Sequence, residues 1–275
     1  MPSRRLLSDF SGLHRNSEVR VTPGRGRPAG GRLILMPANP PVRRIDLNAD
    51  LGEDVTDDPA LLALVTSANV ASGFHAGGPA VMRAVCDRAA DLGVIVGAQV
   101  SYADREGFGR RPMDPGSEVL SAWVAEQVAT LREIARAAGT EVRYLKPHGA
   151  LYNRVVDDEE QASAVLEAAG DLPVLGLPGS AFLRLAQERG SRVVPEGFPD
   201  RGYTADGRLV PRDRPGALVE DIDLIARNAL ELATSGVVET VCVHGDSPRA
   251  VDAARAVAVK LRGAGVELVG WARDL

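Results

Sequence analysis

The sequence is poor in aromatic residues and in cysteine, and each scarcity argues against a class of protein. Aromatic residues make up 4% of the 275 residues, whereas glycine (29 residues), alanine and valine are abundant. This composition suits helices packed on a parallel sheet better than an aromatic-rich β-sandwich. The two cysteines, Cys86 and Cys242, form no CxxC motif or disulfide framework. A reducing cytoplasm is therefore the expected compartment.

Long apolar runs and several catalytic motifs are also missing. No apolar segment approaches the ~20 residues needed to span a bilayer, and residues 33–36 are too short for the core of a signal peptide. We therefore expect no membrane association. The sequence contains no GxxxxGK[ST] loop, no GxSxG elbow and no HExxH motif. It therefore carries no signature of a Walker-type nucleotide site, of that serine-hydrolase class or of a zincin protease.

Charge is unevenly distributed along the chain. Residues 1–40 contain seven arginines and two acidic residues, while the whole chain carries −5, which leaves −10 for the remaining 235 residues. Such an acidic body argues against nucleic acid as the main partner. Residues 1–40 are rich in Arg, Gly, Pro and Ser and show no periodicity. We interpret them as a disordered or non-native extension, with Met36 as an alternative first residue.

From Arg43 onward, strand-like runs alternate with helical patterns. The clearest helix is predicted to begin after Ser117 as its N-cap and to stop at Gly139. Repeated strand–helix alternation predicts parallel strands, and eight strands in about 230 residues predict one (β/α) TIM-like barrel over residues 41–275, with seven or eight mostly parallel strands. An open doubly wound sheet is the alternative. The predicted strands cover residues 43–48, 67–72, 93–101, 142–147, 172–177, 192–198, 240–245 and 266–271.

Polar side chains gather where these strands end. Because the carboxyl ends of parallel barrel strands meet at one face, which carries the active site in this fold, we expect such side chains to converge. Asp46, Asn48 and Asp50 share one parity on the first strand and therefore project to one side. That arrangement fits a general base, a metal site or a network that orients a lysine, and the sequence does not choose among them.

Three of the four histidines follow a strand and closely precede a glycine: His75, His148 and His244. One such histidine would be interpreted as a capping or packing residue, but three at the same topological place favour proton transfer. In the segment "YLKPHGALYN", Lys146 and His148 share one parity, with the rigid Pro147 between them. Both are expected at the mouth of the barrel.

Arginines near the strand ends are candidates for anion binding. Arg110 and Arg111 lie in a loop bracketed by glycine. We expect at least one of them to be an ordinary surface charge and the other to pair with a substrate carboxylate. Arg201 and Arg212 are as consistent with structural ion pairs as with ligand contacts.

Six motifs, taken in order, resemble the LamB/YcsF family of 5-oxoprolinase subunits. They read "IDLNADLGE", "SANVASGFHAGGP", "SYADREGFGRR", "KPHGALYN", "DRGYTADGRLVPR" and "VCVHGDSPRAV". The resemblance runs from about Ile45 to the C-terminus. It implies a barrel related to the glycoside hydrolase/deacetylase group. It also implies that the chain acts with subunits B and C in the ATP-dependent opening of 5-oxoproline to L-glutamate.

The resemblance also suggests roles for individual residues. Asp46 or Asp50, or one of His75 and His148, would move protons. Lys146 would lie over an oxyanion or phosphate, and Arg110 or Arg111 would hold a carboxylate. ATP with Mg²⁺ would be handled together with the partner subunits, and no metal ligand is assigned. The catalytic candidates are Asp46, Asp50, His75, Lys146 and His148. The candidates for contacts with substrate or phosphate are Asn48, Glu53, Asn69, Arg110, Arg111, Asp200, Arg201, His244 and Asp246.

The sequence departs from the family pattern at three positions, and two other functions stay open. Ser72 and Gly78 stand where the family commonly has Cys and Asp, and Gln99 stands where many members have His. One alternative is a metal-dependent deacetylase or hydrolase of a small sugar or amide, with Asp50, His75 and His148 as ligands. The other is a non-catalytic scaffold subunit, in which a change at His148 would leave the assembled complex active.

Overall fold

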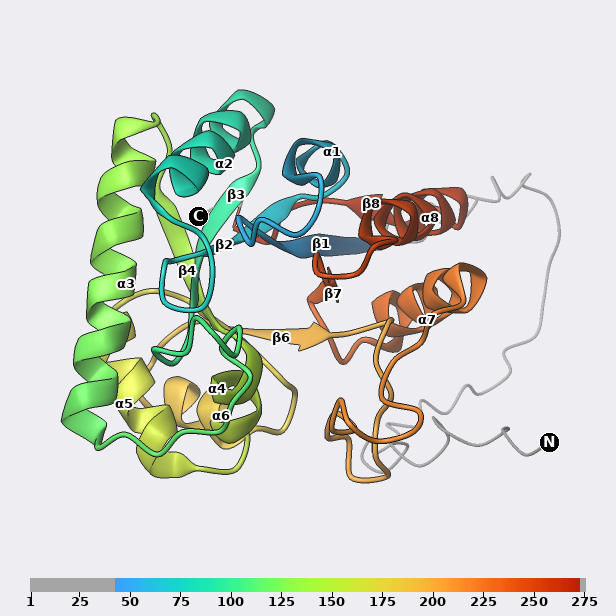
Figure 1. Cartoon of the computed structure of the whole chain (residues 1–275). Coiled ribbons are helices and arrows are strands. Elements are labelled where there is room, and N and C mark those ends of the chain that lie inside the picture. Colours follow the sequence, from blue (N-terminus) through green and yellow to red (C-terminus); the bar gives the residue numbers. More distant parts are fainter. Residues whose placement is uncertain (1–42, 273–275) are drawn as a thin grey trace, which may run out of the picture. The chain divides into compact units, whose positions relative to one another are not determined.

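Parallel strands close into a barrel in residues 43–272, the part of the chain that the computed structural model describes (Figure 1). The strands are β1 (Arg44–Leu51), β2 (Ser67–Ala71), β3 (Ile95–Val100), β4 (Val142–Pro147), β5 (Val174–Gly176), β6 (Val193–Gly197), β7 (Thr240–Val243) and β8 (Glu267–Leu268). Neighbours pair in order from β1 to β7, and β7 pairs with β1, which closes a ring of seven strands within this range. β8 pairs only with the start of β1.

This ring confirms the predicted TIM-like barrel and rules out the open doubly wound sheet. Each of the eight predicted strands overlaps one of these strands. The interpretation of residues 1–40 lies outside the described residues.

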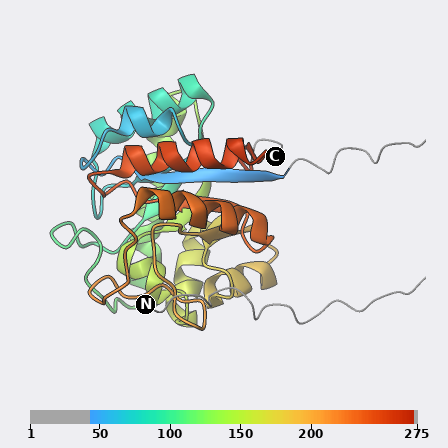
Figure 2. The same ribbon diagram turned by 90° about the vertical axis from the view of Figure 1, so that its right-hand side faces the viewer.

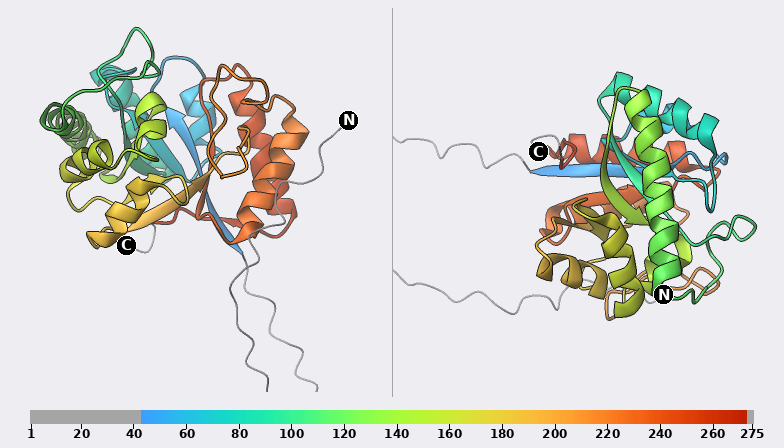
Figure 3. Two further views of the ribbon diagram at one scale, coloured as in Figure 1. Left: turned by 90° about the horizontal axis from the view of Figure 1, so that it is seen from below. Right: turned by 90° about the vertical axis from the view of Figure 1, so that its left-hand side faces the viewer.

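Helices cover the outside of the ring. They are α1 (Asp58–Leu62), α2 (Pro79–Leu92), α3 (Ser117–Ala137), α4 (Gly149–Arg154), α5 (Glu159–Ala169), α6 (Ala181–Glu188), α7 (Ile222–Ser235) and α8 (Ala250–Gly263). α7 and α8 pack side by side next to β1 (Figure 2), and the long α3 runs along the opposite side of the barrel (Figure 3). No helix within the described residues is both long enough and apolar enough to cross a bilayer.

The ends of α3 test the capping prediction. Gly116, not Ser117, is the N-cap, and the Ser117 hydroxyl donates instead to Glu160 at 2.7 Å. At the other end the prediction holds, because α3 stops at Ala137 and Gly139 takes the left-handed backbone conformation (φ 77°). Glycine adopts that conformation without the steric cost of a Cβ atom.

Side chains alternate between the two faces of the barrel wall. On β1, Ile45, Leu47, Ala49 and Leu51 belong to the apolar core between strands and helices. Asp46, Asn48 and Asp50 on the same strand are polar and hydrogen-bond in the interior to side chains of β2, β4, β6 and β7. A strand's period of two residues sets this division. The interior therefore holds a buried polar network together with a small apolar cluster of Tyr144, Leu175 and Val194, in place of the aliphatic layers usual in such barrels.

Gly97 on β3 makes room for the ring of Tyr144 on β4. A Cβ atom at position 97 would lie 2.1 Å from the Tyr144 Cε2 atom, and the ring is fully buried. We expect Gly97→Ala to lower the free energy of unfolding by about 1–3 kcal/mol, the usual cost of overpacking. Gly263→Ala is the matched control, since nothing lies within 4 Å of its Cβ position. The measurement is urea unfolding. Equal free energies of unfolding for Gly97→Ala and Gly263→Ala would contradict this expectation.

Candidate active site

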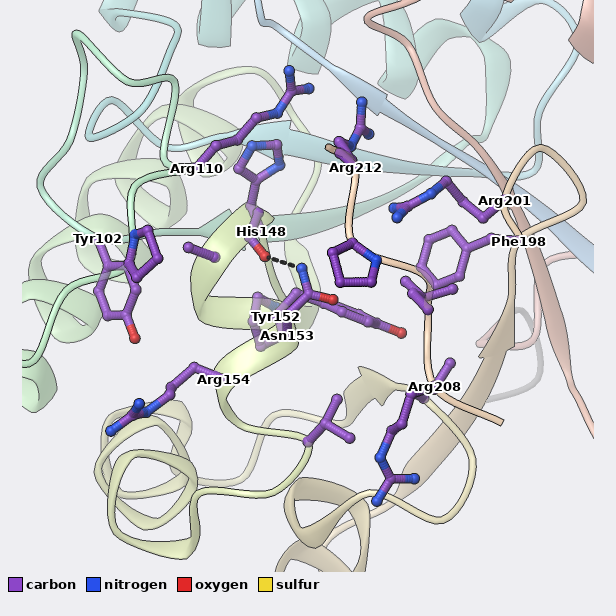
Figure 4. Close-up of a pocket in the computed structure, with 18 of the residues that line it drawn as sticks. Tyr102, Arg110, His148, Tyr152, Asn153, Arg154, Phe198, Arg201, Arg208 and Arg212 are labelled. Carbon is purple, nitrogen blue, oxygen red and sulfur yellow. Dashed lines mark hydrogen bonds between the residues drawn. The ribbon is translucent and has the colours of Figure 1, made fainter. Parts of the chain in front are cut away.

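A cavity of about 700 Å³ opens at the carboxyl ends of the strands (Figure 4). Its walls come from the end of β1 and from the segments that follow β3, β4, β5, β6 and β7. Active sites of barrel enzymes lie at this face. The predicted site residues that line the cavity are Asp50, Arg110, His148, Arg201 and His244.

Lys146 lies beneath the cavity and does not line it. Its Nζ is 2.8 Å from Glu196 Oε1, 3.1 Å from Asp50 Oδ1 and 3.1 Å from Cys242 Sγ. An ammonium group has three protons, so these contacts use all of its donors. Burial alone would lower the pKa of Lys146, but Asp50 and Glu196 hold it well above its usual value. This geometry does not support the predicted role over an oxyanion or phosphate, because the charge is already paired.

Asp50 is the carboxylate that the network presents to the cavity. Its Oδ1 accepts hydrogen bonds from Lys146 and, at 2.8 Å, from Asn69, whereas its Oδ2 accepts none from the described residues. Burial alone would raise the pKa of Asp50, but Lys146 and His244 lower it well below its usual value. Asp50 is therefore a permanent anion, suited to accept a hydrogen bond from a ligand more than to carry a proton.

Asn48 and Asn69 link the buried charges and do not line the cavity. Asn48 Nδ2 donates to Glu196 at 3.0 Å, and Asn69 Nδ2 donates to Asn48 at 2.7 Å. Tyr144 donates to Asn69 Oδ1 at 2.6 Å. Both asparagines are nearly out of solvent. Their predicted contact with substrate or phosphate is thus replaced by a role inside the barrel.

Asp46 lies farther from the cavity than Asp50. It precedes Asp50 by four positions on β1, or about 13 Å along the strand. It accepts hydrogen bonds from the hydroxyls of Thr66 and Ser67, each at 2.6 Å, and from Thr240. It does not line the cavity, so its placement does not support the predicted catalytic role. Burial is the main cause that raises the pKa of Asp46 to about 6.

This raised pKa predicts a pH-dependent contribution to stability. The folded pKa of about 6 exceeds the ordinary value of 3.8, so the folded state holds the proton more tightly. The contribution, about 3 kcal/mol, is complete below pH ~4 and is lost as the pH rises through ~6. Asp46→Asn, which stays neutral, should remove it. The unfolding free energy of the variant relative to the parent should then rise between pH 4 and 7, and a constant difference would contradict the assignment.

His244 and Asp200 form an imidazole–carboxylate pair at the cavity wall, with side chains that are 13% and 14% exposed. Asp200 Oδ2 accepts from the His244 backbone N–H at 3.1 Å and lies 2.9 Å from His244 Nδ1. The ring also stacks on Phe198, with centroids 5.1 Å apart. Burial alone would raise the pKa of Asp200, but His244 lowers it. When the Nδ1–H group donates a hydrogen bond to Asp200, Nε2 has a lone pair that can accept a proton. The sequence predicted ligand contacts for Asp200, and for His244 it predicted both ligand contacts and a place among the histidines suited to proton transfer. This geometry suits proton transfer.

His75 and His148 meet Glu53 behind the cavity wall. The two rings are stacked with centroids 4.0 Å apart, and Glu53 Oε1 lies 3.6 Å from a nitrogen of each. Burial and the neighbouring His75 hold the pKa of His148 well below its usual value. The alternative metal site was predicted to include Asp50, but the group brought together here contains Glu53 in its place.

Three arginines stand along one side of the cavity (Figure 4). Arg110 and Arg212 share one carboxylate, Asp246, and burial together with Arg212 lowers the pKa of Arg110 to about 10. Arg201 donates to the backbone carbonyls of Ala217 and Val210, and no carboxylate of the described residues forms an ion pair with it. This side of the cavity therefore has an excess of positive charge.

Arg111 does not belong to that set. Its side chain is 61% exposed and pairs with Asp104 and Glu106 in its own loop. It is the ordinary surface charge that the sequence predicted for one member of the Arg110–Arg111 pair. Asp246 is the carboxylate partner of two arginines, so its placement supports a positioning role more than a contact with phosphate.

Sequence reasoning missed Glu196, the partner of Lys146 that is entirely buried on β6. The available signal was a charged residue inside a predicted strand, between Pro195 and Gly197. It also gave no role to Cys242, which contacts Lys146.

Comparisons with known proteins find a matching family model and similar proteins. The model of the LamB/YcsF family matches residues 45–274. A protein of Streptomyces coelicolor, named as the A subunit of 5-oxoprolinase, is 55% identical over 249 residues, which cover 83% of this chain and all of the relative. The crystal structure of a lactam utilization protein from Thermus thermophilus is 37% identical, with a TM-score of 0.78 over 83% of this chain and 100% of that one.

A more distant structure shares the fold alone. The catalytic domain of a peptidoglycan N-acetylglucosamine deacetylase from Eubacterium rectale is 12% identical, with a TM-score of 0.52 over 86% of this chain and 92% of that domain. This likeness agrees with a deacetylase-like barrel.

Proposed function

Because this chain belongs to the LamB/YcsF family, we propose that it is the A subunit of an ATP-dependent 5-oxoprolinase and carries the site where the lactam is opened. The substrate would be 5-oxoproline, and the product L-glutamate. The observation that supports this most is the cavity, which faces an oriented imidazole on one wall and surplus arginine charge on another. Both features fit a small cyclic amide that carries a carboxylate.

The arginines would hold the anionic part of the substrate. Arg201 offers a guanidinium that no carboxylate neutralises among the described residues, and Arg212 stands beside it in Figure 4. A guanidinium binds a carboxylate or a phosphate through paired, charge-assisted hydrogen bonds. Arg110 completes this side and would stabilise negative charge that develops on the amide oxygen or on a phosphoryl group attached to it.

His244 would move the protons. Its Nε2 would take a proton from water as the water oxygen attacks the lactam carbonyl carbon, and Asp200 would stabilise the imidazolium. The same proton would pass to the lactam nitrogen as the C–N bond breaks, which yields the amine of glutamate. Where the amide oxygen carries the phosphoryl group of ATP, this opening leaves an acyl phosphate, and a second water would release phosphate and the free carboxylate. Asp50, which stays ionised, would accept a hydrogen bond from the lactam N–H and so orient the ring.

ATP coupling should depend on partner subunits, because this sequence shows no nucleotide-binding motif. We expect the isolated chain to release no glutamate from 5-oxoproline at a measurable rate, with or without Mg-ATP. Addition of subunits B and C with Mg-ATP should restore turnover. The assay is glutamate release measured with and without the partners. Robust ATP-independent turnover by the isolated chain would contradict the proposal.

A scaffold subunit without chemistry is the second candidate. It predicts that changes at His244 or Arg201 leave the assembled complex fully active. The cavity argues against it, since a surface that only docks a partner needs no imidazole–carboxylate pair oriented toward a cavity.

A further inference from the structure

We propose that Glu53, His75 and His148 bind a divalent transition-metal ion of the zinc or manganese class. The three side chains come from the segments that follow β1, β2 and β4, and each is buried. The site lies next to the cavity, which His148 also lines. The proposal concerns these residues alone and does not require the lactam reaction.

The spacing of the three side chains suits one ion. Glu53 Oε1 lies 3.6 Å from His75 Nε2 and 3.6 Å from His148 Nδ1, and all three ligand atoms lie within 4.8 Å of one another. Ligand atoms bound to a tetrahedral ion at about 2.0–2.1 Å stand roughly 3.4 Å apart. A small contraction of the cluster would therefore bring three ligands to bonding distance.

His75 gives the second, independent observation. Its side chain is 0% exposed, and neither ring nitrogen has a hydrogen-bond partner among the described residues. A buried polar group left unpaired costs about 1–3 kcal/mol, so an imidazole with two such atoms calls for a partner. Nε2 faces Glu53, where an ion would satisfy both groups.

His148 is held as a metal ligand usually is. Its Nε2 lies 3.2 Å from the Phe108 carbonyl oxygen and donates to it, which leaves the Nδ1 lone pair on the side of Glu53. Histidine ligands commonly give their second N–H to a backbone carbonyl or a carboxylate. Phe108 has φ 56°, a left-handed conformation that is uncommon for a bulky residue. Strain of this kind concentrates at functional sites.

Ion binding would require two local movements. The rings of His75 and His148 are stacked at an interplanar angle of 15°, so their lone pairs run nearly parallel. His75 can tilt, because no hydrogen bond holds its ring. Gln99 Nε2 lies 3.1 Å from Glu53 Oε1 and 2.8 Å from His148 Nδ1, and Gln99 Oε1 has no partner among the described residues. A half-turn of that amide would present Oε1 as a fourth ligand. Two imidazoles with two oxygens suit zinc or manganese.

The test measures metal binding by the purified full-length chain without substrate or partner subunits. After chelation and dialysis, titration calorimetry with ZnCl₂ and with MnCl₂ should show one ion per chain for at least one of them, with a rise in Tm. His75→Ala and Glu53→Gln should each weaken binding by roughly tenfold or more. X-ray absorption should show nitrogen and oxygen ligands at about 2.0–2.2 Å.

His244→Asn is the matched control, since it removes a histidine of the same cavity that already pairs with Asp200. It should bind the ion as the parent does. Far-UV circular dichroism and melting of the metal-free variants would show that they fold. The proposal is overturned if the parent binds neither ion, or if His75→Ala binds as tightly as the parent. Neither result bears on lactam hydrolysis, because no catalytic readout enters the test.

Discussion

His244→Asn should lower kcat for glutamate formation by the partner-assembled enzyme by about 10²–10⁴-fold, the range typical of a lost general base. Asparagine keeps part of the shape of the imidazole but cannot accept a proton from water. The Asp200 carboxylate would remain beside it and would lose the hydrogen bond that the imidazole Nδ1–H donates. Glutamate release under saturating 5-oxoproline and Mg-ATP measures kcat, and substrate titration separates it from KM.

Asp200→Asn tests whether the pair acts as a unit. It removes the acceptor that fixes the His244 Nδ1 proton, so kcat should fall by a factor comparable to that of His244→Asn. The double variant should be no worse than the more damaging single variant, because residues that act together show non-additive losses. Arg111→Gln, whose exposed side chain lies outside the cavity lining, is the control and should keep activity within about twofold. Full activity of His244→Asn would favour the scaffold function.

The sequence contained most of the fold because alternation is a local signal. Strand and helix runs are set by side-chain period and by glycine positions, and the count of eight alternating strands favours a barrel. Even the two faces of β1 could be assigned, since Asp46, Asn48 and Asp50 share a parity. The count of strands favoured a closed ring, but the pattern could not show which strands pair to close it, because pairing between β1 and β7 joins residues far apart in sequence.

The roles of single residues in the site were harder to predict. They depend on how far along its strand a residue lies from the cavity, and on which side chains it contacts across the barrel. Asp46 and Asp50 differ by four positions on one strand, yet one lies among hydroxyls and the other lines the cavity. Lys146 has the sequence context of a catalytic cation, but Glu196 and Asp50 consume its charge. No local pattern shows which carboxylate will face which cation across a barrel.

Lys146→Met should have the largest effect on stability. It would leave Asp50 and Glu196, side chains that are 5% and 0% exposed, without the cation that both contact. Removal of one partner from a buried ion pair costs about 3–5 kcal/mol, because the remaining charge stays desolvated. For a protein of this size that corresponds to a fall in Tm of roughly 6–20 °C. Methionine fills a similar volume, so the effect would report charge and not a void.

The chain offers one matched control and one rescue for this experiment. Lys260, the only other lysine of the sequence, is exposed on α8, and Lys260→Met should leave the urea midpoint unchanged. Adding Glu196→Gln to Lys146→Met removes one stranded carboxylate and should recover part of the loss. An unchanged midpoint for Lys146→Met would mean that the two carboxylates do not need the lysine. If Glu196→Gln instead lowered the free energy of unfolding as much in the Lys146→Met variant as in the parent, the two losses would be additive. Glu196 would then not be stabilised through Lys146. Recovery in the double variant, by contrast, would show that Lys146 stabilises the barrel through its ion pair with Glu196.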